Sequence, residues 1–160
     1  MPGTGLVPAR GNAETRWFET ASAATFAKGS LVNFNNAYRL KEYESTDSQA
    51  VGVALSYSTQ STSIRGLNMV AVAIPTPNCT FYSDITTGVT QSAMSIGKKI
   101  LVYKQGNVMS YASTVIGEAS RFSAIAQVVG PIDATLSRVE IAFNLDGVAF
   151  YSTSSATFTA

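Results

Sequence analysis

The 160-residue sequence predicts an all-β fold, an antiparallel β-barrel or β-sandwich with an extended N-terminal arm. Short runs rich in β-branched and aromatic residues recur at close intervals, and turn residues separate them. No long segment has the 3.6-residue periodicity of an amphipathic helix. Two stretches also resemble copies of one β-unit, which raises the hypothesis of an internal duplication.

Each proposed copy reads as a hairpin followed by a third strand. The first copy has strand-like runs at 30–34, 37–43 and 50–57, and the second has them at 99–104, 107–112 and 124–130. Leu31 in the first copy corresponds to Ile100 in the second, although the polar insert is longer in the second. A scaffold made by duplication is therefore expected.

The remaining strands are predicted at 67–75, 79–83, 137–145 and 148–151. Alternation in the third of these predicts one buried and one wet face, with Val139, Ile141, Phe143 and Leu145 in the core. Asp146-Gly147 then predicts a two-residue hairpin, because both residues tolerate positive φ. Residues 69–74 are apolar on both faces, which is typical of a central strand.

The chain divides into three parts by its pattern. Residues 1–16 contain proline, glycine and scattered polar groups without periodicity, so they are expected to form an extended N-terminal arm. Residues 17–151 carry the strand pattern and form the β-barrel or β-sandwich domain. Residues 152–160 are predicted to be a flexible Ser/Thr-rich tail.

The composition argues against several classes of function. The 11 basic and 10 acidic residues nearly cancel, which gives no electrostatic basis for binding nucleic acid. There is no histidine, and Cys79 is the single cysteine, so an intramolecular disulfide and the usual zinc and copper sites cannot be assembled. We expect no cofactor and no metal, and we expect Cys79 to be a small buried apolar group.

The sequence also predicts neither a membrane span nor a secretory leader. No run approaches the roughly 18 apolar residues of a membrane helix. The first residues lack the basic and continuous apolar regions of a signal peptide, so a soluble product of the cytoplasm is expected. A surface that is poor in charge and rich in small polar residues suits contact with other proteins.

Two sequence motifs resemble those of catalytic sites. Ser95 and Lys98 match the Ser-x-x-Lys arrangement of acylating enzymes, but Gly97 lies within the motif and no companion motif follows. Glu42 and Glu44 share one face of a strand, as paired carboxylates of glycosidases can, yet they lie at the end of a strand beside a polar turn. We interpret the first as chance and the second as a solvated strand end, so no enzyme is predicted.

One region resembles a known family. The sequence from Phe26 through Gly29 to Val32, then Leu40-Lys41, a Ser/Thr/Asp spacer and Ala50-Val51-Gly52-Val53-Ala54, resembles the small capsid decoration proteins, or cement proteins, of tailed bacteriophages. The resemblance covers roughly residues 25 to 56. It implies a compact β-barrel or β-tulip-like module without catalytic residues.

The same resemblance implies where the protein acts. It implies a virion protein, made in the host cytoplasm, that binds the outer surface of an icosahedral capsid and clamps neighbouring major capsid proteins. It further implies a homo-oligomer, a trimer or a dimer. Because many copies bind one shell and each bridges several partners, modest affinity per copy is sufficient.

The N-terminal segment is the expected capsid contact, because an arm that becomes ordered on binding adds contact area and can pair with a sheet edge. The candidate contact residues are Leu6, Val7, Pro8, Arg10, Arg16, Trp17 and Phe18. Under this hypothesis, deletion of residues 1–16 weakens binding to the shell and leaves the free protein folded.

Two other functions remain as alternatives. A carbohydrate-binding or adhesin module of a phage tail or fibre would use exposed aromatic rings such as Tyr57, Tyr82 or Tyr111. A small hydrolase would use Ser95 or the pair Glu42 and Glu44, and it ranks last.

Overall fold

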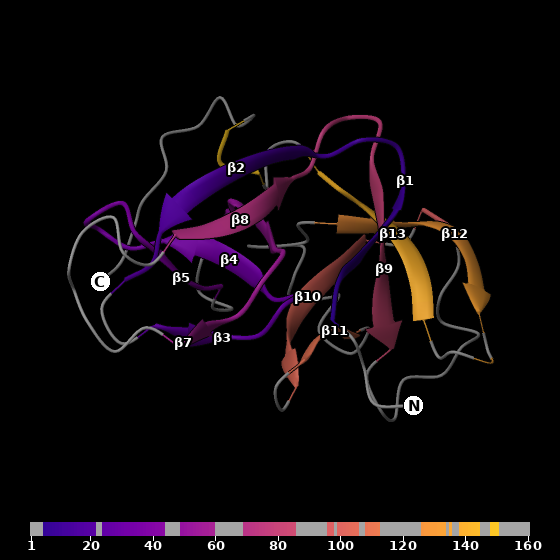
Figure 1. Cartoon of the computed structure of the whole chain (residues 1–160). Coiled ribbons are helices and arrows are strands. Elements are labelled where there is room, and N and C mark those ends of the chain that lie inside the picture. Colours follow the sequence, from indigo (N-terminus) through magenta and orange to yellow (C-terminus); the bar gives the residue numbers. More distant parts are fainter. Residues whose placement is uncertain are drawn as a thin grey trace.

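The computed structural model describes residues 5–21, 24–43, 49–59, 69–85, 96–97, 99–105, 108–112, 126–133, 135, 138–144 and 148–150. Within these residues every regular element is a β-strand, so the predicted all-β class is confirmed. Two larger sheets lie side by side, one built mainly from the first half of the chain and the other from the second half (Figure 1).

The N-terminal sheet has five strands in the order β2-β8-β6-β4-β5. They are β2 (Glu14–Glu19), β4 (Leu31–Phe34), β5 (Leu40–Glu42), β6 (Gly52–Ala54) and β8 (Met69–Ile74). All four ladders are antiparallel, and a parallel bridge from Thr20 to Leu40 joins the end of β2 to β5. The pairing thus runs from β2 through β8, β6, β4 and β5 and back to β2, as in a barrel.

The C-terminal sheet contains six strands in the order β1-β9-β11-β10-β12-β13, and β9 also pairs with β13. They are β1 (Val7–Arg10), β9 (Thr80–Ile85), β10 (Lys99–Gln105), β11 (Val108–Ala112), β12 (Ala126–Asp133) and β13 (Arg138–Phe143). The contact of β9 with β11 is parallel, and the other pairs are antiparallel. Five of these strands, β9 to β13, thus also pair in a ring.

The two rings have the same connectivity. In chain order, β2, β4, β5, β6 and β8 correspond to β9, β10, β11, β12 and β13, and each neighbouring pair in one ring has its counterpart in the other. Even the parallel contact recurs, because Thr20 bridges Leu40 in one ring and Asp84–Ile85 pair with Ser110–Tyr111 in the other. The hypothesis of two related β-units extends in the structure to five strands per half.

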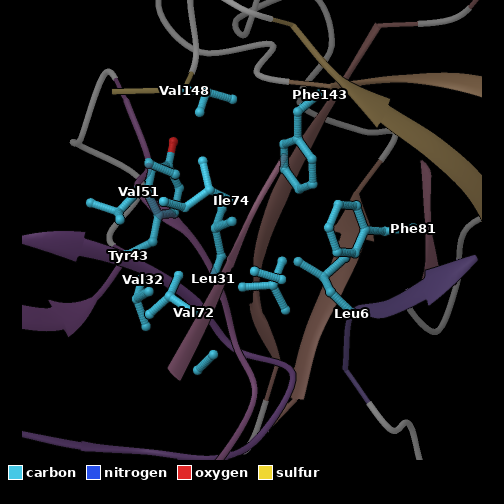
Figure 2. Close-up of a cluster of buried hydrophobic side chains, with 14 of the residues drawn as sticks. Leu6, Leu31, Val32, Tyr43, Val51, Val72, Ile74, Phe81, Phe143 and Val148 are labelled. Carbon is cyan, nitrogen blue, oxygen red and sulfur yellow. The ribbon is translucent and has the colours of Figure 1, made fainter. Parts of the chain in front are cut away.

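One hydrophobic cluster joins the sheets. Its members come from β4, β6 and β8 on one side and from β9, β12 and β13 on the other. Figure 2 shows side chains of both sheets in this cluster, among them Leu6, Leu31, Val72 and Phe81. β8 is buried from Val70 to Ile74 and lies between β2 and β6, which confirms the predicted central strand. A small third sheet pairs β3 (Thr25–Phe26) with β7 (Ser58–Thr59).

Each predicted strand in the described residues has an observed counterpart, with one exception, whereas β1, β2, β3 and β7 were not predicted. The predicted strand at 148–151 is wrong: Val148 makes only an isolated bridge to Ala50, and residues 149–150 form a turn. Some predictions concern residues outside the described ones: Leu145, the Asp146-Gly147 hairpin, residue 151 and the tail 152–160. The predicted core residues Val139, Ile141 and Phe143 are buried.

Candidate interaction surface

The N-terminal segment differs from the free arm that the sequence predicts. Its described part is extended, but β1 pairs with β9 and β2 pairs with β8, so this segment belongs to both sheets. The boundary expected between residues 16 and 17 falls inside β2. Figure 1 shows the chain passing from β1 at one sheet to β2 at the other.

Gly11 makes the passage between the two strands possible. Its φ is +76°, a conformation that favours glycine, and a Cβ atom at this position would lie 2.0 Å from the carbonyl oxygen of Asn78. Gly11 therefore connects β1 to β2 at a point where the backbone passes so close to Asn78 that only a residue without a side chain fits.

Residues at the start of β1 tie it to the rest of the domain. Leu6 is 2% exposed and belongs to the hydrophobic cluster. Its backbone N–H donates to the carbonyl oxygen of Gly29 over 2.9 Å, and the N–H of Gly5 donates to Oδ2 of Asp84 over 3.0 Å. Deletion of residues 1–16 would remove this packing, so the free protein is no longer expected to remain intact without them.

A buried carboxylate holds the other end of β1. Glu140 on β13 has a side chain that is only 7% exposed. The Arg10 guanidinium donates to it twice, from Nε to Oε2 over 2.6 Å and from an Nη to Oε1 over 2.9 Å. The Thr80 hydroxyl donates to Oε2 over 2.6 Å, and the N–H of Arg10 donates to that hydroxyl. We call Arg10, Thr80 and Glu140 the carboxylate clamp.

The clamp determines the charge state of Glu140. Burial by itself raises the pKa of this carboxyl group, but the hydrogen bonds from Arg10 and Thr80, together with the Arg10 charge, outweigh burial and hold the pKa below its ordinary value. The same hydrogen bond and charge raise the pKa of Arg10. Both carboxylate oxygens are engaged, so the arrangement fits a structural ion pair that fastens β1 to β9 and β13.

The sequence pattern misplaces Glu140. Alternation along β13 predicts a wet position for it, yet the residue is buried, with the Arg10 side chain from β1 and the Thr80 hydroxyl from β9 bonded to its carboxylate. An irregularity in β12 between Val128 and Ile132 accommodates the carboxylate. Gly130 lies within it, and a Cβ atom there would be 2.6 Å from Oε1 of Glu140. A glycine followed by proline inside a strand pattern was the available signal for such a bulge.

β2 carries aromatic side chains on both of its faces. Trp17 is 62% exposed and shares its face with Met69, which is 41% exposed on the neighbouring strand β8. On the opposite face, the Phe18 ring packs edge-on against Phe34 at 5.1 Å and stacks with Phe150 at 5.9 Å between centroids. We call Trp17 and Met69 the apolar pair.

The seven contact candidates fall into distinct environments. Leu6 is a core residue and is withdrawn as a contact, because its side chain is not accessible. Val7 and Phe18 are partly buried. Four side chains remain exposed in the described structure: Pro8, Arg10, Arg16 and Trp17. Arg16 also forms an exposed ion pair with Glu14 at 2.8 Å, and its guanidinium carbon lies 5.0 Å from the centre of the Phe150 ring.

The residues of the alternative functions are not assembled into one site in the described part of the chain. Glu42 is partly buried on β5, and Glu44, Ser95 and Lys98 lie outside the described residues. Tyr57 is 72% exposed, whereas the ring of Tyr82 is covered by the Arg138 guanidinium at 4.0 Å. The side chain of Tyr111 lies outside the described structure. Cys79 is buried, as predicted.

Comparison with known protein families finds no family model that matches the chain, and comparison with curated proteins finds no relative. Among the described residues, no group of three or more His, Cys, Asp or Glu side chains could hold a metal ion. The described part also contains no helix that is long and apolar enough to cross a membrane.

Proposed function

We propose that this protein is a virion structural protein that binds the outside of an icosahedral capsid and stabilises contacts between major capsid proteins. The observation that carries the proposal is the doubled scaffold, in which two rings share one strand order. A chain with two related halves can contact two neighbouring copies of a repeated partner. The segment that resembles cement proteins includes β4, β5 and β6, three strands of the first ring.

The surface of β1 is the shell contact in this proposal. Pro8 is exposed there, and the carboxylate clamp holds the strand in a fixed position. A contact strand that is already ordered loses little conformational entropy on binding, which favours affinity. A mostly uncharged contact also suits a shell surface that presents many identical sites, since affinity per site can be modest.

Cosedimentation with purified capsids of the encoding virus, before and after shell expansion, tests the proposal. We expect saturable binding to at least one form of the shell and greater resistance of that shell to heat. Absence of binding to both forms would refute the function. A selective signal on a glycan array, without binding to shells, would instead favour the carbohydrate-binding alternative.

The position of the contact has a separate test. Pro8→Glu places a charge on the exposed side of β1, and Lys28→Glu places one at an exposed turn as the matched control. We expect shell occupancy to fall for the first variant and to persist for the second. If both variants bind as well as the unmodified protein, the contact lies elsewhere while the proposed function stands.

A further inference from the structure

The turn between β4 and β5 contains a strained aromatic residue. Tyr38 has a φ of +60°, and among the described residues it is the one residue other than glycine with a positive φ. Bulky residues rarely adopt this left-handed conformation, because it brings their Cβ atom too close to the following carbonyl oxygen. The side chain of Tyr38 is also 70% exposed, so burial in the core does not offset the strain.

Hydrogen bonds hold the turn that carries Tyr38 in one conformation. Oδ1 of Asn35 accepts from the N–H groups of Ala37 and Arg39, over 2.9 and 3.0 Å. The N–H of Tyr38 donates to the carbonyl oxygen of Asn35 over 3.0 Å, and the N–H of Asn35 donates to that of Arg39 over 2.8 Å. Nε of Arg39 also lies 3.4 Å from Oε2 of Glu19 on β2. The turn therefore presents the tyrosine in a fixed position.

The corresponding turn of the second ring has a different sequence. β10 and β11 pair as far as Gln105 and Val108, so Gly106 and Asn107, which lie outside the described residues, connect the two strands. Glycine and asparagine are the residue types that best tolerate a positive φ. The first ring instead has tyrosine at a position where either of these residues would relieve the strain.

Strain at an exposed aromatic residue points to a binding role. Residues held in sparsely populated conformations cost free energy, and they are common where a protein binds a ligand or a partner. Residues 36–38 are all exposed and form a projecting turn, which we call the hairpin tip. Sites for small molecules are concave, whereas an aromatic ring on a projecting tip fits a pocket of another protein. The hairpin tip therefore favours a protein partner over a sugar.

We propose that Tyr38 is the contact of the first ring with the shell, and that its aromatic ring inserts into an apolar pocket of a major capsid protein. This inference rests on the proposed function, in which β1 on the second sheet is the other contact. Each half of the chain then supplies one contact, so one molecule bridges two neighbouring capsid proteins. Two linked contacts bind more tightly than either contact alone.

Cosedimentation of Tyr38→Asn with purified capsids tests the inference. Asparagine fits the left-handed conformation of the turn, and the substitution removes the aromatic ring. We expect the apparent dissociation constant for the shell to rise by at least about tenfold, while the melting temperature of the free protein does not fall. Tyr57→Asn is the matched control, because Tyr57 is 72% exposed and lies outside the hairpin tip. This control should bind like the unmodified protein.

Two further variants separate loss of the contact from a disturbed turn. Ala37→Glu leaves the tyrosine in place and adds a charge beside it at an exposed position, so shell occupancy should fall. Tyr38→Phe keeps both the aromatic ring and the strained backbone, so most of the binding should remain.

Three results bear differently on this inference and on the proposed function. If the unmodified protein binds shells and both Tyr38→Asn and Ala37→Glu bind equally well, the inference is wrong and the function stands. If the unmodified protein binds neither form of the shell, the function and the inference both fail. If Tyr38→Asn abolishes a selective signal on a glycan array and leaves shell binding intact, the hairpin tip recognises a sugar, which overturns the proposed contact.

Discussion

Arg10→Met is the perturbation that most directly tests the role of the carboxylate clamp. The variant keeps most of the aliphatic stem and removes both guanidinium hydrogen bonds to Glu140, which stays buried with the Thr80 hydroxyl as its remaining clamp donor. A hydrogen bond to a charged group contributes about 1.5–3 kcal/mol. Because the Arg10 side chain is 67% exposed, solvent reduces the ionic part. The expected loss at pH 7 therefore comes from the buried Glu140 carboxylate, because leaving a buried acceptor without its donors costs about 1–3 kcal/mol.

The pKa shift of Glu140 predicts how the stability difference between the two proteins changes with pH. In the unmodified protein the pKa of Glu140 is lowered, so the stabilisation from this group is present at neutral pH and is lost as the pH falls through its folded-state pKa. In Arg10→Met the guanidinium hydrogen bonds no longer oppose burial, so the pKa should rise above the unfolded value of about 4.3. The difference between the two proteins should then shrink as the pH is lowered from 7 towards 4.

Urea unfolding at several pH values measures this difference. Arg16→Met is the matched control, because the exposed pair of Arg16 and Glu14 is expected to contribute at most about 1 kcal/mol. Arg10→Met combined with Glu140→Gln should be less destabilised than the two single changes predict together. Equal stabilities of Arg10→Met and Arg16→Met, or a difference that grows on acidification, would refute the reasoning.

Three further substitutions test how the N-terminal segment and the bulge fit the fold. Leu6→Ala removes a side chain that is 2% exposed, so urea unfolding should show a loss of about 2–5 kcal/mol, whereas a free arm would show almost none. Gly130→Ala brings a Cβ atom to 2.6 Å from Oε1 of Glu140 and should cost about 1–3 kcal/mol, measured in the same way; a neutral effect would mean that the bulge yields easily. Gly11→Ala would require alanine to adopt a positive φ and would bring its Cβ atom against the carbonyl oxygen of Asn78. Calorimetry should show a lower melting temperature, by about 2–4 °C for each kcal/mol of stability lost. An unchanged melting temperature would contradict the close approach of Gly11 to Asn78 between β1 and β2.

The sequence by itself determined the fold class and most of the strands, because burial on one face of a strand imposes a period of two on the residues. Val139, Ile141 and Phe143 were placed in the core by that alternation, and the run from Met69 to Ile74 was placed in a central strand by its lack of polar positions. The repeated hairpin followed by a third strand was also readable, since turn residues mark its ends.

Only the tertiary structure decided where the N-terminal segment lies and what it covers. Residues 5–19 show little periodicity, because their positions depend on pairing with strands that are distant in sequence. Glu140, a charge that alternation assigns to the wet face, is buried and bonded by the Arg10 side chain of this segment, whereas Trp17 of the same segment stays exposed. Local patterns record which face of a strand is apolar, whereas edge pairing and the partner of a buried charge depend on contacts between residues far apart in the chain.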